Sequence, residues 1–362
     1  MSPAQADGPE TDGPDTDAQA TTDRTEEESL AQARAAGIHL MAVPTPFLVG
    51  RVNCYLIEDD PLTLIDTGPN SGKSLDELER ALAELGHPIE DLGLIVITHQ
   101  HMDHLGLLEI IARRSGAEVA ALDVLGPYLE DFSASATADD EFSMGVMRRH
   151  GVPAELATAL GSVGAAFRAF GSSGHVSVPL REGSELTLRD RTLTALHRPG
   201  HSPSDTVLWD EQRRILIAGD HLLARISSNP LISRPLSGAP AGPTASDRPH
   251  ALVQYMASLR QTREMPAALV LGGHGPPVRD HAALIDERFR MSERRAGKVR
   301  RLLESGPQTA YDLASQMWGN VAVTQAFLTI SEVLGHLDLL IADGRAAEDD
   351  SGPVTLFTAV DP

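Results

Sequence analysis

A run of three histidines and one aspartate constrains the fold more than any other feature of this sequence. It directly follows the apolar stretch 92–98, which is rich in β-branched residues and typical of a strand buried on both faces. Residues two apart in an extended segment face the same side, so His99 and His101 can reach one metal ion. Asp103 and His104, at the following turn, can face a second ion. The run therefore predicts a two-metal site where a buried strand ends.

Three further potential metal ligands each follow a predicted strand. They are His201 in RPGHSPSD, Asp220 in ILIAGDHL and His274 in LVLGGHG. Loops at the ends of strands carry the functional groups of open α/β folds. A histidine-rich surface loop is the alternative interpretation of the first run alone, and these three positions argue against it. Mixed nitrogen and oxygen ligands suit zinc, although iron or manganese also accepts them.

The rest of the first 280 residues alternates strand and helix patterns, which predicts an α/β fold. Expected strands are 52–57, 62–65, 92–98, 118–122, 185–188, 193–196, 206–209, 215–218 and 268–271. Expected helices are 74–85, 105–114, 153–170 and 251–265. A capping box of Ser74 and Glu77 would begin the first helix. The single cysteine, Cys54, excludes an intramolecular disulfide, and its strand context favours a core position.

Five motifs in this order resemble those of the metallo-β-lactamase superfamily: Asp66 in IDTG, the run HQHMDH, His201, Asp220 and His274. The resemblance covers about residues 45–280 and implies a four-layer αβ/βα sandwich. It also implies two metal sites of three ligands each, His99, His101 and His201 for the first and Asp103, His104 and His274 for the second. Asp220 would bridge the two ions, whereas Asp66 would orient ligands without binding metal.

One departure bears on the substrate. Antibiotic-degrading members commonly have a cysteine ligand where this chain has Asp220, so the family name does not indicate the substrate. The ligand set instead resembles that of hydroxyacylglutathione hydrolases, the glyoxalase II-like enzymes, and of metal-dependent ribonucleases. We expect two divalent metal ions to generate a bridging hydroxide that attacks a carbonyl carbon or a phosphorus. Asp220 would hold the two ions together, and Asp103 would assist proton movement.

After His274 the pattern predicts helices only, at 281–304, 309–318 and 323–342, followed by a hairpin of 345–348 and 354–358. Three helices and a hairpin resemble the winged-helix appendage of a lactamase-like branch that includes endoribonucleases. We therefore expect a catalytic domain over residues 37–284 and a winged-helix-like domain over residues 285–362.

Three functions remain open: hydrolysis of a small-molecule ester or thioester, single-strand-specific endoribonuclease activity, and non-enzymatic winged-helix binding. RNA binding would use seven cations of one helix: Arg288, Arg290, Arg294, Arg295, Lys298, Arg300 and Arg301. Glu287, Glu293 and Glu304 oppose this interpretation, which leaves a solvated helix face as the alternative. Residues 319–344 contain no Lys or Arg, unlike a helix that reads DNA. We favour an ester or thioester substrate, and a homodimer is compatible with the sequence.

The N-terminal segment is acidic. Residues 1–28 hold nine acidic residues and one arginine, and therefore about a third of the net charge of −21. The segment has few large apolar side chains, which predicts a disordered tail over residues 1–36. We see no secretory signal and no apolar stretch of membrane-spanning length, and therefore expect a cytoplasmic protein without a membrane partner.

Overall fold

The computed structural model describes residues 16–236 and 248–361, and of residues 16–23 it gives only the backbone. Its first sheet has the strand order β1-β2-β3-β4-β5-β6, with antiparallel pairing from β1 to β3 and parallel pairing from β3 to β6. The bounds are β1 Ile38–Val43, β2 Val52–Ile57, β3 Thr63–Ile65, β4 Leu94–Ile97, β5 Glu118–Leu122 and β6 Val178–Leu180. Cys54 is buried in β2, as expected.

The second sheet has five strands in the order β11-β10-β9-β8-β7. Their bounds are β7 Ser184–Thr187, β8 Thr192–His197, β9 Thr206–Asp210, β10 Ile215–Gly219 and β11 Leu269–Gly272. Only β10 and β11 run parallel to each other. Side chains from both sheets, such as Val96, Leu208 and Ile217, form the core between them.

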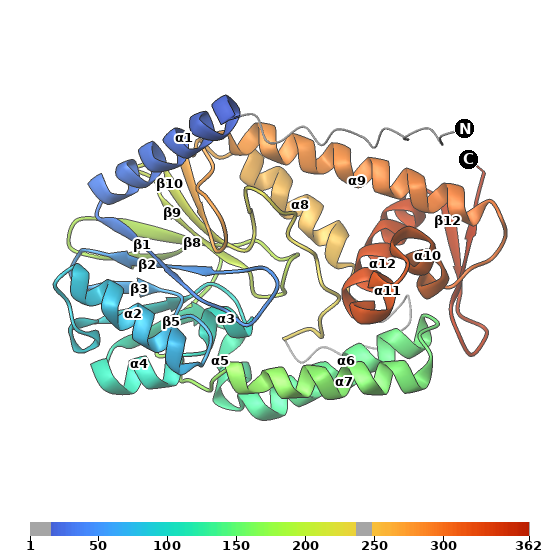
Figure 1. Cartoon of the computed structure of the whole chain (residues 1–362), viewed down its shortest axis with the longest axis horizontal. Coiled ribbons are helices and arrows are strands. Elements are labelled where there is room, and N and C mark those ends of the chain that lie inside the picture. Colours follow the sequence, from blue (N-terminus) through green and yellow to red (C-terminus); the bar gives the residue numbers. More distant parts are fainter. Residues whose placement is uncertain (1–15, 237–247, 362) are drawn as a thin grey trace, which may run out of the picture.

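Helices cover the outer face of each sheet (Figure 1). On the first sheet these are α2 Gly72–Glu84, α4 Leu108–Ser115 and α5 Leu125–Glu130. On the second they are α8 Ala251–Arg263 and the beginning of α9 His281–Leu303. Ile95 and Ile97 of β4 pack toward the helices, while Leu94 and Val96 pack toward the second sheet. This central strand is therefore buried on both faces, and the predicted four-layer sandwich is confirmed.

The predicted C-terminal elements are present as α10 Ala310–Trp318, α11 Val321–Thr324, α12 Ala326–Ala342 and a hairpin of β12 Ala346–Asp349 and β13 Leu356–Ala359. Two earlier helices, α6 Phe132–Arg149 and α7 Ala154–Phe167, contribute side chains to the hydrophobic core of these C-terminal elements. α9 places Ile285 in the core beneath the second sheet and Val299 in the C-terminal core. One helix thus runs through the expected boundary at residue 285. The winged-helix assignment and the division at 285 stay predictions.

The expected disordered tail is wrong for its second half. Residues 1–15 lie outside the described residues, but α1 spans Thr16–Ala35. Ala33 packs into the core between the sheets, and Ser29 Oγ accepts a hydrogen bond of 2.8 Å from Arg279 Nε. Apolar side chains are too sparse in this helix for a periodic pattern, which explains why the sequence did not predict it.

The helix α2 begins earlier than expected. Its N-cap is Ser71, whose side chain accepts from the Ser74 backbone N–H, so the predicted capping box of Ser74 and Glu77 is wrong. The Ser74 hydroxyl instead donates to the Pro44 carbonyl at 2.8 Å.

None of the helices in the described ranges is long and apolar enough to cross a membrane.

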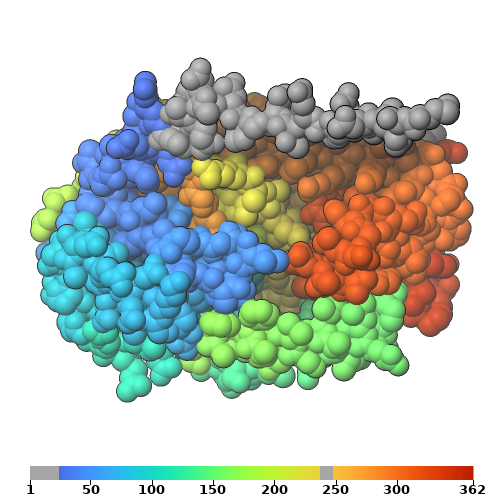
Figure 2. Space-filling model, in the orientation of Figure 1, coloured from blue at the N-terminus to red at the C-terminus, as the bar shows by residue number. Residues whose placement is uncertain are grey.

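The surface is hollowed between the blue segment near residue 50, the green helices α6 and α7, and the orange C-terminal helices (Figure 2). A cavity of about 600 Å³ lies in this region, and residues from both sheets' loops and from α6 and α12 line it.

Candidate metal centre

The structure brings all seven predicted ligands together at one edge of the two sheets. Four follow strand ends: His99 after β4, His201 after β8, Asp220 after β10 and His274 after β11. The other three lie at the short helix α3 (Met102–Leu105): His101, Asp103 and His104. Because these strands of both sheets end at the same edge, residues far apart in the sequence meet here.

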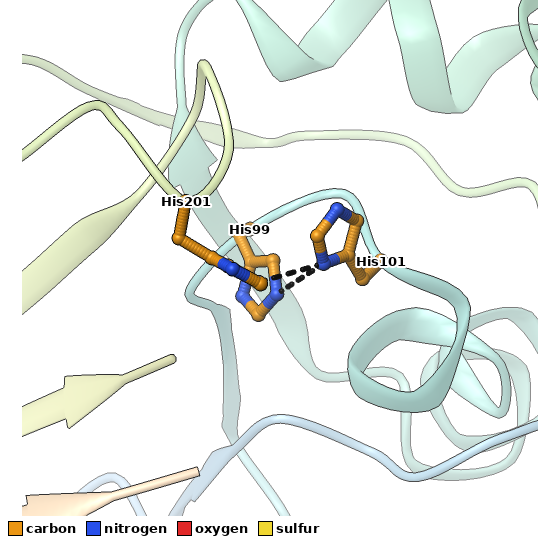
Figure 3. Close-up of side chains that lie close together, drawn as sticks. All are labelled: His99, His101 and His201. Carbon is orange, nitrogen blue, oxygen red and sulfur yellow. Dashed lines mark hydrogen bonds between the residues drawn. The ribbon is translucent and has the colours of Figure 1, made fainter. Parts of the chain in front are cut away.

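The first group consists of His99, His101 and His201. His101 Nδ1 lies 3.1 Å from His99 Nε2 and 2.9 Å from His201 Nε2. The three rings point toward one another from two separate loops (Figure 3). This is the trio that the resemblance assigns to one metal ion.

The second group consists of Asp103, His104 and His274, with His274 Nε2 3.3 Å from Asp103 Oδ2. Asp220 lies between the groups. Its Oδ1 is 3.4 Å from His104 Nε2, and its Oδ2 is 3.4 Å from His274 Nε2 and 3.5 Å from His201 Nε2. One carboxylate therefore contacts ligands of both groups, as a bridging residue must.

Asp66 orients two of these rings from behind. Its Oδ2 accepts from His104 Nδ1–H at 2.7 Å and from the Thr98 hydroxyl at 2.8 Å, and its Oδ1 accepts from the Thr98 backbone N–H at 2.9 Å. Since the Thr98 hydroxyl hydrogen is donated to Asp66, its oxygen accepts from His99 Nδ1–H at 3.0 Å. Both imidazoles thus keep Nε2 free of hydrogen. Asp66 adopts a φ of 58°, a strained conformation of the kind that concentrates at functional sites.

Backbone carbonyls fix two further rings. His201 Nδ1–H donates to Asn229 O at 3.0 Å, and His274 Nδ1–H donates to Arg51 O at 2.7 Å. A carbonyl oxygen can only accept, so the hydrogen of each ring must sit on Nδ1. Each Nε2 then presents a lone pair to the centre, which is the tautomer that a metal ligand requires.

The chemistry of these donors fits a bound cation. In the first group, the lone pairs of His99 Nε2 and His201 Nε2 both face His101 Nδ1, which can donate a hydrogen to only one of them, and a cation among the three atoms would satisfy them all. His104 Nε2 and His274 Nε2 of the second group, and Asp220 Oδ1 between the groups, are buried without a hydrogen-bond partner in the described part of the chain. Unsatisfied buried polar atoms are costly, and metal coordination would satisfy them.

Burial and charge support the same conclusion. Burial lowers the pKa of His99 well below its usual value and that of His101 to about 3, so both rings are neutral. Burial opposes a charge on His104, yet Asp220 and Asp66 raise the pKa of that imidazole well above its usual value. The carboxylates of Asp220 and Asp66 therefore favour positive charge at the centre. A bound metal ion supplies this charge while the His104 ring stays neutral.

Gly273 keeps the space between two ligands open. A Cβ atom at this position would lie 2.3 Å from Asp220 Oδ1 and 2.7 Å from His104 Cε1. Side chains of β2 hold the same loop, because Asn53 Nδ2–H donates to Gly272 O at 2.9 Å and Tyr55 O–H donates to it at 2.7 Å.

A sequence model of the metallo-β-lactamase superfamily matches residues 48–274, which include every predicted ligand. The chain belongs to this superfamily. A superfamily relative from Bacillus subtilis (strain 168), named probable metallo-hydrolase YqjP, is 35% identical over 301 residues, covering 83% of this chain and 91% of the relative. This chain is accordingly a metallo-β-lactamase-superfamily hydrolase.

Two other similarities concern the fold and a substrate class. The crystal structure of a metallo-β-lactamase family protein from Thermus thermophilus matches with a TM-score of 0.72 and 26% identity, covering 90% of this chain and 99% of that one. Acyl-coenzyme A thioesterase MBLAC2 of Gallus gallus is 31% identical over 182 residues, which are 47% of this chain and 57% of the relative.

Sequence reasoning named Asp66 as an orienting group but missed the other groups that orient the ligand rings. Thr98 directly precedes the histidine run, so its position was available as a signal. The carbonyls of Arg51 and Asn229 left no signal, because any residue type supplies a backbone oxygen. Arg288 was also misjudged.

Arg288 of α9 holds the loop that supports the metal centre instead of facing solvent. Its Nη2 donates to Leu223 O at 3.1 Å, to Ala224 O at 3.3 Å and to Ile226 O at 3.0 Å. The same loop supplies Asn229 O, the acceptor of the His201 ring. The C-terminal part of the chain is thereby connected to a predicted ligand.

We expect Arg288→Ala to weaken metal binding about tenfold, because groups that orient a ligand typically contribute about 10–100-fold to metal affinity. Competition with a chromogenic chelator measures this. Arg290→Ala is the matched control, since Arg290 lies on the same helix, is 61% exposed and pairs with Glu287 at the surface. Equal metal affinity of the two variants would show that the hydrogen bonds from Arg288 to this loop do not contribute to metal binding.

Proposed function

We propose that this chain is a binuclear metal-dependent hydrolase that acts on an ester or thioester of a small molecule. The observation that carries the proposal is the position of the seven donor residues, five of which line a largely apolar cavity: His101, Asp103, His201, Asp220 and His274. A reactive centre at the wall of such a cavity is the usual arrangement of a small-molecule enzyme.

Two divalent ions would occupy the two groups, and the ligand types favour zinc, with iron or manganese as alternatives. His99, His101 and His201 would hold the first, Asp103, His104 and His274 would hold the second, and Asp220 would contribute to both. When bound, the ions supply an activated water and polarise the substrate carbonyl.

The remaining chemistry falls to the protein. The Asp103 carboxylate belongs to the second ligand group and lies 3.3 Å from His274 Nε2. Asp103 also lines the cavity, where its carboxylate can accept a proton from the attacking water and return it to the leaving group. Asp66 and Thr98 keep the ligand rings oriented throughout.

The cavity favours an acyl substrate over RNA. Its two arginines, Arg168 and Arg234, are paired with Asp140 and Asp139, respectively, at Nε–Oδ distances of 2.6 and 3.1 Å. An RNA backbone needs cations that are free to pair with phosphates. The acyl-coenzyme A thioesterase relative supports the same choice.

Several cations of α9 are also paired with carboxylates. Arg294 pairs with Glu287 at 2.8 Å, and Arg295 pairs with Glu332. This agrees with the solvated-face interpretation of the helix. A homodimer and a cytoplasmic location stay predictions.

We expect metal-loaded protein to hydrolyse an acyl thioester faster than it cleaves labelled single-stranded RNA, at both low and moderate salt. The double change of Arg294 and Arg295 to Ala should leave thioester turnover unchanged, because both cations are satisfied by carboxylates. The proposal fails if RNA cleavage dominates and the double variant both weakens it and flattens its dependence on salt.

A further inference from the structure

The cavity beside the metal centre is built for an apolar group. Aromatic side chains from separate elements face it: Phe47 before β2, Tyr128 of α5, Phe132 and Phe142 of α6, and Phe327 of α12. Its volume of about 600 Å³ lies within the roughly 300–1,000 Å³ typical of sites for small organic ligands. A centre that only hydrolysed acetyl-sized groups would not need this space.

Charges in the cavity are neutralised away from the metal centre. Asp139 and Asp140 of α6 pair with Arg234 and Arg168, which cancels the charges that this wall presents. Among the described lining residues, the carboxylates without an arginine partner are therefore those of the ligands Asp103 and Asp220. A carbonyl group suits the metal end, and an uncharged chain suits the remainder.

One lining residue, Phe47, belongs to a small aromatic cluster. The Phe47 ring lies 5.5 Å from the Phe167 ring and 6.0 Å from the Phe170 ring, centroid to centroid. The segment before β2 is thereby packed against the end of α7. Ile226 and Leu328 line the cavity and are also 45% and 39% exposed, so the apolar wall continues to the surface. A chain can enter along this apolar edge.

We propose that the acyl portion of the substrate is a medium-length or long apolar chain, which lies between α6, α12 and the loop around Ile232 with its carbonyl at the metal centre. The inference rests on the proposed function, and it adds the class of acyl group and the residues that select it. Burial of one methylene contributes about 0.8 kcal/mol, which corresponds to about a fourfold gain per methylene.

The experiment compares thioesters of one thiol with acetyl, butanoyl, hexanoyl, octanoyl, decanoyl and dodecanoyl groups on the metal-loaded full chain. We expect kcat/KM to rise about fourfold per methylene among the shorter chains and to level off once the cavity is filled. A second readout is calorimetric binding of hexanoate and dodecanoate, the carboxylate products, where dodecanoate should bind more tightly.

Two variants test the location of the chain. Phe142→Ala enlarges the cavity and should move the preferred acyl group to a longer chain, whereas Ala136→Phe fills it and should selectively reduce turnover of the long chains. Phe289→Ala is the control, because Phe289 stacks under Arg260 at 5.6 Å, away from the cavity lining. The Phe289→Ala variant should keep the wild-type dependence of kcat/KM on acyl-chain length.

The outcomes separate the two proposals. A chain-length profile that is flat, or that Phe142→Ala and Phe289→Ala leave equally unchanged, overturns the acyl-chain inference while the hydrolase proposal stands. If no ester or thioester is hydrolysed but dodecanoate still binds more tightly than hexanoate in a manner sensitive to Phe142, the proposed function fails and the apolar binding site stands. Equal binding of the two carboxylates overturns the inference on its own.

Discussion

Asp220→Ala is expected to reduce kcat/KM for the thioester at least about a hundredfold and to weaken metal binding. Asp220 is the carboxylate that contacts both ligand groups, at 3.4 Å from His104 and His274 and 3.5 Å from His201. Even groups that only orient a ligand contribute about 10–100-fold, so loss of a shared ligand should cost more. Steady-state kinetics with metal analysis of the same sample measures both effects.

Asp76→Ala serves as the matched control for Asp220→Ala, because Asp76 is an exposed carboxylate on α2 and belongs to none of the donor groups. It should retain wild-type kinetics and metal content. Asp220→Asn removes the charge but keeps the shape of the side chain, and we expect its kcat/KM and metal content to lie between those of Asp220→Ala and the wild type. Wild-type turnover in Asp220→Ala would show that the reaction does not need the Asp220 carboxylate.

The largest expected change in stability is about 3–5 kcal/mol, from Asp338→Ala. Asp338 of α12 and Arg248, just before α8, have fully buried side chains and form two hydrogen bonds, one of them 2.6 Å long. Glu348 of β12 lies 3.5 Å from the same guanidinium. Removal of Asp338 leaves a buried cation with too little compensation. Unfolding in denaturant measures the loss.

Two further variants decide the cause of that loss. Combining Arg248→Met with Asp338→Leu removes both charges and should recover most of the lost stability, because apolar replacements of a buried pair are often neutral. Glu293→Ala breaks an exposed pair with Arg345 and should cost less than about 1 kcal/mol. If Asp338→Ala costs no more than Glu293→Ala, the buried pair does not hold α12 against the segment before α8.

The strands and the ligands could be predicted because their signals are local. Within the run 92–98, residues 94–97 are apolar throughout, as burial on two faces requires, and β4 alternates its side chains between the two cores. His99 follows directly, so its place at the sheet edge was implied by the strand. The same reasoning located His201, Asp220 and His274 at strand ends.

The walls of the cavity could not be predicted in this way. The helix α6 was missed because its sequence is rich in Ser, Ala and Asp, and only four of its 18 residues are buried. Two of the cavity aromatics, Phe132 and Phe142, lie on this helix. Another, Phe327, is far away in the sequence, and no local pattern indicates that it would face the same space.

The C-terminal helices were expected to form a separate unit, and their packing suggests a more direct role. They share a core with α6 and α7, and α12 supplies Phe327 and Leu328 to the cavity. Asn229 Nδ2–H donates to Leu328 O at 3.3 Å, so α12 also supports the loop that orients His201. These contacts place α12 beside both the cavity and the loop that orients His201.

The most direct test of the central claim is the metal content of the full chain purified without chelator, measured by mass spectrometry against protein concentration. Two groups of three donors, with Asp220 between them, predict close to two equivalents of transition metal per chain, with zinc the most abundant. Removal of the metal should abolish hydrolysis, and its return should restore it. Protein that contains no metal, and that hydrolyses the thioester equally well after treatment with chelator, would contradict the account.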